Sequence, residues 1–155
     1  MARLAPGALA PDFTLAADDG TDLTLSDLRG GRVVLYFYPK AETSGCTTEA
    51  CEFRDATPDF HAKGARVIGI SPDPVAKQVK FRDKHALSFT LLSDTEHSVA
   101  EAYGVWVEKK MYGNTYMGVE RSTFVIGPDG VVEEALYKVR PKGHAASVLG
   151  VLATA

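Results

Sequence analysis

The chain has few cysteines, no long apolar stretch and no long run of charges of one sign. Its 155 residues include two cysteines, Cys46 and Cys51, too few for a structural zinc site made of soft ligands. No apolar run approaches the roughly 20 residues that a membrane-spanning helix needs, so we expect no membrane association. Seventeen basic and twenty acidic residues give a net charge of -3 without a long run of one sign, which argues against nucleic-acid binding.

The first residues are not expected to form a targeting signal. The segment MARLAPGALAPDF is interrupted by Pro6 and Pro11, and it is too short for the apolar core of a secretory signal. We therefore expect a cytoplasmic protein, in which the two cysteines are reactive or incidental rather than a structural cross-link. With 45% hydrophobic residues in a chain of this length, one domain spanning residues 1–155 is expected.

Strand and helix patterns alternate along the chain. Apolar, β-branched or aromatic runs typical of buried strands cover 32–38, 65–71 and 122–126, and weaker patterns predict a hairpin strand over 131–139 and a short N-terminal hairpin formed by 13–15 and 22–24. Helical patterns cover 46–63, 74–85, 97–103 and 142–152. This order indicates an α/β fold with a mixed central sheet flanked by helices and an N-terminal hairpin addition.

Proline marks two expected helix boundaries. Asp73 before Pro74 predicts an N-cap followed by a proline at the first helical position. Thr57 and Pro58 repeat this pattern inside the first helical stretch, so that helix is expected to kink or split there.

Several polar residues are expected to have no chemical role. Four histidines without ligand-like spacing are predicted to lie at the solvated surface, and we expect neither a metal nor a cofactor: His61, His85, His97 and His144. The segment 103–118 is interpreted as a loop and sheet edge near the site. Within it, burial is the expected reason for Trp106, and Lys109 and Lys110 are interpreted as a solvated face.

Cys46 is the candidate nucleophile. If a helix begins between Thr43 and Gly45, Cys46 lies in its first turn, where unpaired backbone N–H groups and the helix dipole stabilise an anion. The thiolate is the nucleophilic form of cysteine, and helix N-termini favour it. The alternative role is that of a small buried apolar residue, although the surrounding TSGCTT is polar.

Cys51 cannot reach Cys46 while the helix is intact. Five helical positions rotate a side chain by roughly 140° and displace it by about 7.5 Å along the axis, whereas a disulfide needs converging Cβ vectors. If the two cysteines pair, the helix must partly unwind first. The alternative is that Cys51 is only a buried helix residue. The C-x4-C spacing also differs from the C-x-x-C of thioredoxin-type exchange centres.

The segment around Cys46 resembles the active-site loop of peroxiredoxins, whose pattern is P-x-x-x-T-x-x-C. Pro39, Thr43 and Cys46 match it, and TSGCTTEACEFRD resembles the Q-type, or bacterioferritin comigratory protein, branch. Further likeness runs from APDFTL through LYFYPK and VIGISPD to RSTFVIGPDG. The resemblance implies a thioredoxin-like fold and a thiol peroxidase that reduces hydrogen peroxide or organic hydroperoxides, with thioredoxin or a similar dithiol as reductant. Such relatives are often monomers and sometimes dimers.

The same resemblance implies roles for the two cysteines. Cys46 would attack the peroxide and become a sulfenic acid. Cys51 sits where the family's Q-type members carry the resolving cysteine, which would form an intramolecular disulfide with Cys46.

Four further residues take their implied roles from the family pattern. Thr43 would hydrogen-bond the peroxide or thiolate, and Pro39 would shield the site. Arg121 matches an arginine that stabilises the thiolate and polarises the peroxide. Glu49, three residues after Cys46, would orient Arg121.

One departure from the family pattern is Ser44, where many relatives carry proline. The missing ring is expected to loosen the loop before the helix without removing a reacting group. Two rival functions remain open at this point: a thiol–disulfide exchange protein without peroxidase activity, and a redox sensor or holdase without peroxidase turnover.

Overall fold

Strands and helices alternate along residues 3–153, the part of the chain that the computed structural model describes. The elements are β1 (Thr14–Ala17), β2 (Asp22–Thr24), the 3-10 helix η1 (Leu25–Leu28), β3 (Arg32–Phe37), α1 (Ser44–Ala62), β4 (Ala65–Ser71), α2 (Val75–His85), β5 (Thr90–Ser93), α3 (Ser98–Ala102), β6 (Trp106–Met111), β7 (Asn114–Val119), β8 (Ser122–Ile126), β9 (Val132–Leu136) and α4 (His144–Ala153). No helix in this part of the chain is both long and apolar enough to span a membrane.

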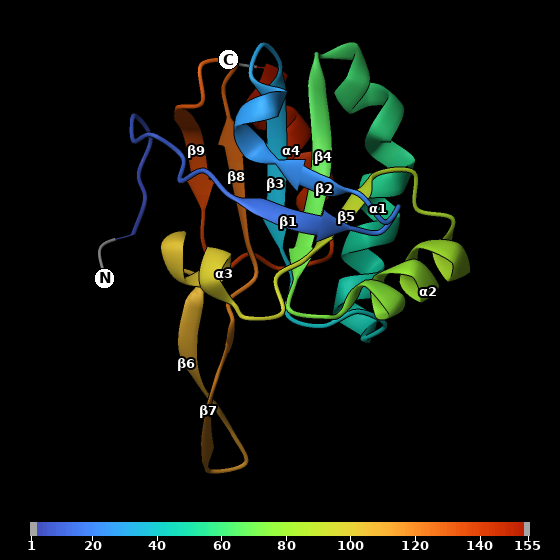
Figure 1. Cartoon of the computed structure of the whole chain (residues 1–155), viewed down its shortest axis with the longest axis vertical. Helices are drawn as coiled ribbons and strands as arrows, with labels where there is room; N and C mark the ends of the chain where they lie inside the picture. The colour runs from blue at the N-terminus through green and yellow to red at the C-terminus, as the bar shows by residue number, and fades with distance from the viewer. Residues whose placement is uncertain (1–2, 154–155) are drawn as a thin grey trace.

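The main sheet is mixed, as expected, and runs in the order β2-β1-β5-β4-β3-β8-β9 (Figure 1). β3 pairs in parallel with β4 and antiparallel with β8, and β4 pairs in parallel with β5. The N-terminal hairpin of β1 and β2 is confirmed, and β1 also pairs with β5. Phe37 at the end of β3 lies opposite Ser122 at the start of β8. The loops that leave β3 and enter β8 therefore meet at one end of the sheet.

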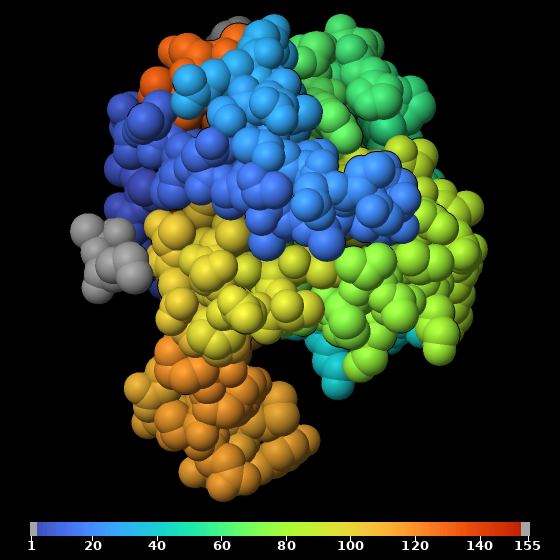
Figure 2. Space-filling view, in the orientation of Figure 1, coloured from blue at the N-terminus to red at the C-terminus, as the bar shows by residue number. Residues whose placement is uncertain are grey.

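A second, two-stranded sheet is formed by β6 and β7, which projects from that end of the molecule (Figures 1 and 2). Tyr112 and Gly113 make its tight turn with positive φ angles of 53° and 80°, the conformation of a type I′ hairpin turn. This hairpin replaces the expected loop. Trp106 at its base is half-buried, and its ring stacks on His97 with centroids 4.0 Å apart.

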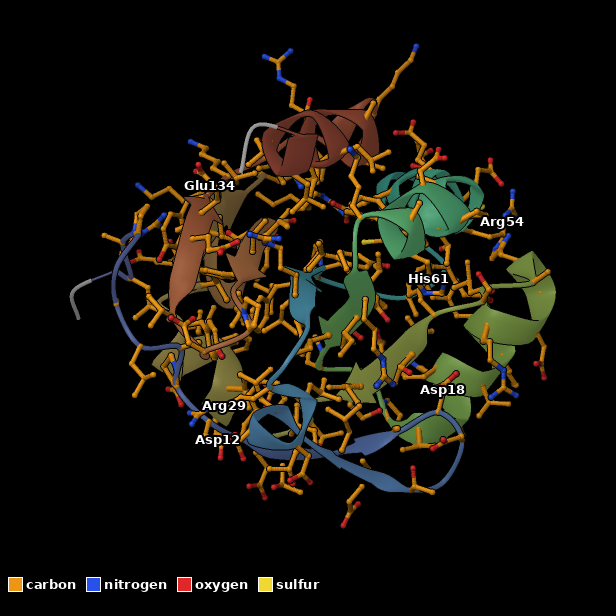
Figure 3. The ribbon with its side chains drawn as sticks, turned by 90° about the horizontal axis from the view of Figure 1, so that it is seen from above. Asp12, Asp18, Arg29, Arg54, His61 and Glu134 are labelled. Atoms are coloured by element: carbon orange, nitrogen blue, oxygen red, sulfur yellow. The ribbon has the colours of Figure 1, made fainter. Side chains whose placement is uncertain are left out.

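Both faces of the main sheet are covered, which explains the continuous apolar character of β3. Val34 and Tyr36 belong to the core beneath α1, α2 and α4, whereas Val33, Leu35 and Phe37 belong to the core on the opposite face, with α3 and η1. Figure 3 shows α1 and α4 on one side of the central strands and, on the other, the N-terminal hairpin, which forms one edge of the same sheet.

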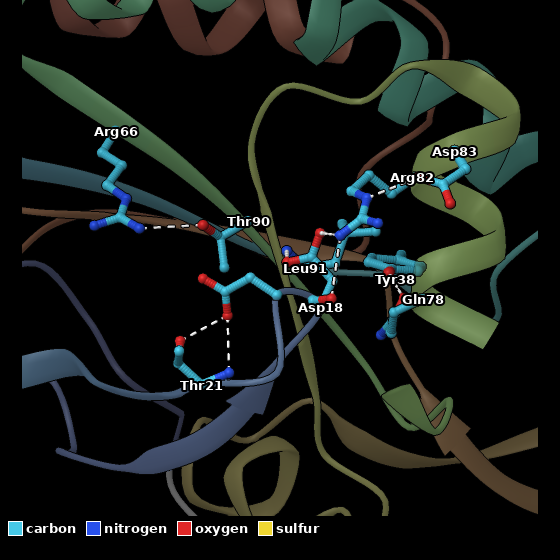
Figure 4. A network of polar contacts seen from close by, with 10 residues as sticks. Asp18, Thr21, Tyr38, Arg66, Gln78, Arg82, Asp83, Thr90 and Leu91 are labelled. Atoms are coloured by element: carbon cyan, nitrogen blue, oxygen red, sulfur yellow. Dashed lines mark hydrogen bonds and ion pairs between the residues drawn. The ribbon is translucent and has the colours of Figure 1, made fainter. Parts of the chain in front are cut away.

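Buried polar contacts attach the N-terminal hairpin to the rest of the fold (Figure 4). The carboxylate of Asp18 accepts hydrogen bonds from Arg82 Nη1 on α2 at 3.3 Å and from the Leu91 backbone N–H on β5 at 3.2 Å. These bonds satisfy a carboxylate that is 9% exposed, and they join the hairpin to both elements.

One expectation about helix boundaries is wrong, and a second is wrong in that no split occurs. Asp73 does not cap α2, because its Oδ2 accepts from the Ala41 backbone N–H and from Ser71 Oγ, both at 2.7 Å, and Pro74 occupies the N-cap position. The first helix does not split at Pro58. It continues because Pro58 is exposed, whereas Phe53 and Phe60 on either side of it are fully buried in one core.

The expectation that all four histidines are solvated is also wrong for His144. Its ring is 5% exposed, its Nε2 lies 2.7 Å from Thr123 Oγ1, and Phe53 contacts it edge to face. Burial, with a smaller effect from the charge of Arg121, lowers the pKa of His144 from 6.5 to about 4. The folded protein therefore holds this ring in its neutral form.

Replacing His144 with glutamine should flatten the acid side of the stability profile. The unfolded chain binds a proton near pH 6.5 and the folded chain only near pH 4, so the contribution of His144 is present above pH 6.5 and is lost as the pH falls through that window. Urea unfolding at pH 7 and pH 4 should show that the wild type loses about 2 to 3 kcal/mol more than His144→Gln. Equal losses would contradict this account.

Candidate active site

The residues implied by the family pattern converge where β3 ends and β8 begins. Pro39 lies in the loop after β3 and is half-buried, Thr43 is the N-cap of α1, and Cys46 is the third residue of that helix. Arg121 directly precedes β8. The pairing of β3 with β8 brings these two segments together although 75 residues separate Cys46 from Arg121.

Cys46, Arg121 and Glu49 form one buried cluster. Arg121 Nη2 lies 3.3 Å from Cys46 Sγ, and its Nη1 donates to Glu49 Oε1 at 2.6 Å. Cys46 is 1% exposed and Glu49 is 0% exposed. A cation beside the sulfur and the first-turn N–H groups of α1 both stabilise a negative charge at this position.

Burial and the ion pair act in opposite directions on Glu49. Burial raises the pKa of Glu49 from 4.5 to about 7, although the charge and hydrogen bond of Arg121 lower it. Glu49 Oε2 is buried without a hydrogen-bond partner among the described residues. The pKa of Arg121 is raised: burial lowers it, but Glu49 and Cys46 together outweigh burial. The guanidinium is thus held between two acidic groups.

The loop before α1 is held by hydrogen bonds within the loop, to the first turn of α1 and to Asp73. Thr43 Oγ1 donates to the Lys40 carbonyl at 2.8 Å, and the Thr43 carbonyl accepts from the Thr47 N–H at 2.9 Å. Asp73, which does not cap α2, instead anchors Ala41. Because the hydroxyl hydrogen of Thr43 is engaged, its oxygen is left as an acceptor for a bound molecule.

Cys51 lies apart from this cluster. Both thiols are free, and α1 is continuous through Cys46 and Cys51. Cys51 is half-buried. The structure therefore describes the reduced protein with an intact helix.

Two site residues escaped the sequence reasoning. A Cβ on Gly45 would lie 3.3 Å from Arg121 Nη2 and 3.4 Å from Pro141 Cγ, so the absence of a side chain leaves the guanidinium its place beside the sulfur. Lys109, expected on a solvated face, is half-buried, and its charge interacts with Arg121 and Cys46. Neither the clearance at Gly45 nor the electrostatic interaction of Lys109 has a local signal, because both depend on segments far apart in the chain.

The cluster is suited to nucleophilic thiol chemistry. It combines a buried sulfur, a fixed cation and an oriented hydroxyl acceptor, which together stabilise an attacking thiolate and bind a small polar molecule. Within residues 3–153, no group of three or more histidine, cysteine or acidic side chains is arranged to hold a metal ion.

Known proteins share this fold and much of this sequence. The model of the AhpC/TSA family matches residues 6–135. Peroxiredoxin Bcp of Bacillus subtilis (strain 168) is 50% identical over 146 residues, which cover 94% of this chain and 93% of that protein. The structure of peroxiredoxin Q from Xanthomonas campestris is 39% identical, with a TM-score of 0.89 over 98% of this chain and 96% of that one. A PrxQ mutant from Xylella fastidiosa, 37% identical, gives a TM-score of 0.93 over 99% and 98% of the two chains. These structures confirm the thioredoxin-like fold.

Replacing Arg121 with methionine should destabilise the protein in a pH-dependent way. The pKa of Glu49 is raised, so its ionisation lowers the free energy of unfolding as the pH rises from 4.5 through about 7, and Arg121 limits that loss. Without Arg121, the loss of stability should be about 3 kcal/mol at pH 8.5 and about 1 kcal/mol at pH 6, measured by urea unfolding.

The double variant Arg121→Met/Glu49→Gln is the matched control. It has no carboxylate at this site and so does not share the wild type's loss of stability from pH 4.5 through about 7. Its deficit relative to the wild type should therefore be about 1 kcal/mol smaller at pH 8.5 than at pH 6, the opposite trend to that of Arg121→Met. The explanation fails if Arg121→Met alone loses equal stability at pH 6 and pH 8.5.

Proposed function

This chain belongs to the AhpC/TSA family as a peroxiredoxin, a thiol peroxidase, and we propose that Cys46 attacks the peroxide and Cys51 resolves the oxidised sulfur. Peroxiredoxins act on peroxides and are reduced by thiols. The observation that carries the assignment of Cys46 is its contact with Arg121, 3.3 Å from sulfur to guanidinium in a buried site. Cys51 is half-buried, and the charge that acts on it is that of Arg54, with no hydrogen bond from that guanidinium to the sulfur in the described part of the chain.

In the first step, the Cys46 thiolate attacks the terminal oxygen of the peroxide. The S–O bond forms as the O–O bond breaks, leaving a sulfenic acid and an alkoxide or hydroxide that takes up a proton and departs as alcohol or water. Thr43 Oγ1, which donates to Lys40, accepts the hydrogen bond of the incoming hydroperoxide. Arg121 stabilises the charge that moves from sulfur to the leaving oxygen. Pro39 shields the site from water, and Glu49 orients Arg121.

In the second step, the Cys51 thiol attacks the sulfenic sulfur, releasing water and forming the Cys46–Cys51 disulfide. The intact α1 forbids this bond, since the two side chains point roughly 140° apart. The first turns of the helix must therefore unwind. That motion breaks the Arg121–Glu49 pair and the hydrogen bond from the Gly143 N–H to Glu52 Oε1.

Thioredoxin or a similar dithiol then reduces the disulfide and allows the helix to re-form. A buried Cys46, 1% exposed in the reduced form, is out of reach of a protein reductant, whereas an unwound segment presents the disulfide to it. We further propose that the protein is cytoplasmic, where thiol reductants are available, and that it works as a single domain and a monomer. The cycle is compatible with this, because both cysteines lie on the same chain.

Serine variants of the two cysteines separate the two steps. Cys46→Ser should abolish peroxide consumption, because no thiolate remains beside Arg121. Cys51→Ser should keep the first oxidation and stall turnover with thioredoxin, since the sulfenic acid has no internal partner. Stopped-flow peroxide consumption and peptide mass mapping of the oxidised protein check both results. Full activity of Cys46→Ser would refute the proposal, and slow turnover with a tight, oxidation-dependent partner would favour a redox sensor.

Replacing Ser44 with proline should slow disulfide formation without changing the first oxidation. Ser44 is the first residue of α1, where proline fits, and Thr43 before it is extended, with φ -81° and ψ 155°. Proline there should stabilise the folded helix by about 0.4 to 1 kcal/mol, which lowers the unwinding equilibrium two- to fivefold. Single-turnover kinetics of sulfenic acid decay give the rate. An unchanged or faster decay of the sulfenic acid would show that the first turn of α1 does not open during disulfide formation.

A further inference from the structure

The β6–β7 hairpin carries one lysine that behaves differently from its neighbours. Tyr112 at the tip is 97% exposed, and Glu108 and Lys110 on β6 are exposed, whereas Lys109 between them is half-buried. In the described part of the chain, no carboxylate lies within ion-pair distance of Lys109 Nζ. A partly buried ammonium without an ion-pair partner requires an explanation.

The pairing of the two strands shows where the Lys109 side chain runs. Lys109 lies opposite Tyr116, and Val107 lies opposite Gly118, so all four share one face of the hairpin. A Cβ on Gly118 would meet Lys109 Cδ at 3.3 Å and Cε at 3.6 Å. The lysine stem therefore crosses Gly118, on the side of Tyr116 away from the hairpin tip. It points to the base of the hairpin, where β7 leads into Arg121.

The charged groups that act electrostatically on Lys109 belong mostly to the active site. It interacts with Arg121, with Cys46 and with Glu120. Glu120 is engaged elsewhere, because its Oε1 pairs with Arg3 Nη1 at 2.7 Å. Burial and the Arg121 guanidinium lower the pKa of Lys109, whereas Cys46 and Glu120 raise it. Apart from Glu120, the acidic group that acts on this ammonium is the Cys46 thiol itself.

We propose that Lys109 is a second cation of the peroxidase site, held over Gly118 by the hairpin, which stabilises the Cys46 thiolate and the negative charge of the peroxide's leaving oxygen. This inference rests on the proposed role of Cys46. Arg121 contacts the sulfur directly, and Lys109 adds its charge from the base of the hairpin, without a direct contact. The stacking of Trp106 on His97 fixes the base of the hairpin and thereby the position of the lysine.

The experiment measures the reactivity of the Cys46 thiol alone, in a protein in which Cys51 is replaced by serine. The rates of alkylation by iodoacetamide and of oxidation by hydrogen peroxide are followed against pH. Lys109→Met keeps the length of the side chain and removes its charge. The alkylation midpoint should rise by about 0.5 to 1 pH unit, and below the midpoint both rates should fall about three- to tenfold, because less thiolate is present.

Three further variants separate charge at this position from other effects. Lys110→Met removes the same charge from the opposite face of β6 and should leave the midpoint unchanged. Lys109→Arg should restore most of the wild-type rate. Gly118→Val keeps the lysine but places a side chain in its path, so it should raise the midpoint as Lys109→Met does.

Two results would overturn the inference. One is a midpoint in Lys109→Met equal to that in Lys110→Met, and the other is no shift in Gly118→Val. Circular dichroism of each variant confirms that the fold is retained. Either result leaves the proposed function standing if Cys46→Ser still abolishes peroxide consumption, so the two failures are distinguishable.

Discussion

The site depends on the contacts of the Arg121 guanidinium with Cys46 and Glu49. The guanidinium lies between Cys46 Sγ and Glu49 Oε1, at 3.3 Å and 2.6 Å, and thereby joins the start of α1 to the start of β8. Each partner would be unfavourable alone, since a buried carboxylate and a buried guanidinium both lose hydration. Together they hold a cation beside the reactive sulfur. Gly45 leaves room for it, and Asp73 anchors the adjoining loop through Ala41.

The helix that builds this site also opposes the second half of the proposed cycle. An intact α1 supplies N–H groups and the Glu49 side chain to the site, yet it keeps Cys51 on another side of its axis. The reduced state must therefore be stable enough to assemble the cluster and labile enough to open. Within the proposed cycle, Ser44 at the first position of α1 would favour opening, because serine leaves the unfolded loop more freedom than proline. In the proposed cycle, the core around Phe53 and Phe60 would confine the unwinding to the first turns of the helix.

Local patterns were sufficient for most of the fold. The apolar run of β3 indicated a strand buried on both faces, because alternate residues enter opposite cores. Patterns of the same kind located β4 and β8. Two of the failures share one cause, which is that a distant group competed with the local signal. Asp73 bonds Ala41 instead of capping α2, and His144 is drawn into the core by Thr123 and Phe53. The β6–β7 hairpin was missed because Tyr112 takes a positive φ that favours glycine or asparagine.

The sequence by itself determined the candidate nucleophile and the spacing of the two thiols. A thiol near a helix start and a second thiol five residues later are readable from the residues, because they depend on helical period and on residue type, whereas the role of Arg121 was implied by the family pattern. Only the tertiary structure decided which charges surround the sulfur. The ion pair of Glu49 with Arg121, the clearance at Gly45 and the path of Lys109 over Gly118 join segments of the chain far apart in sequence. Burial then sets the strength of those charges, and burial is a property of the packed molecule.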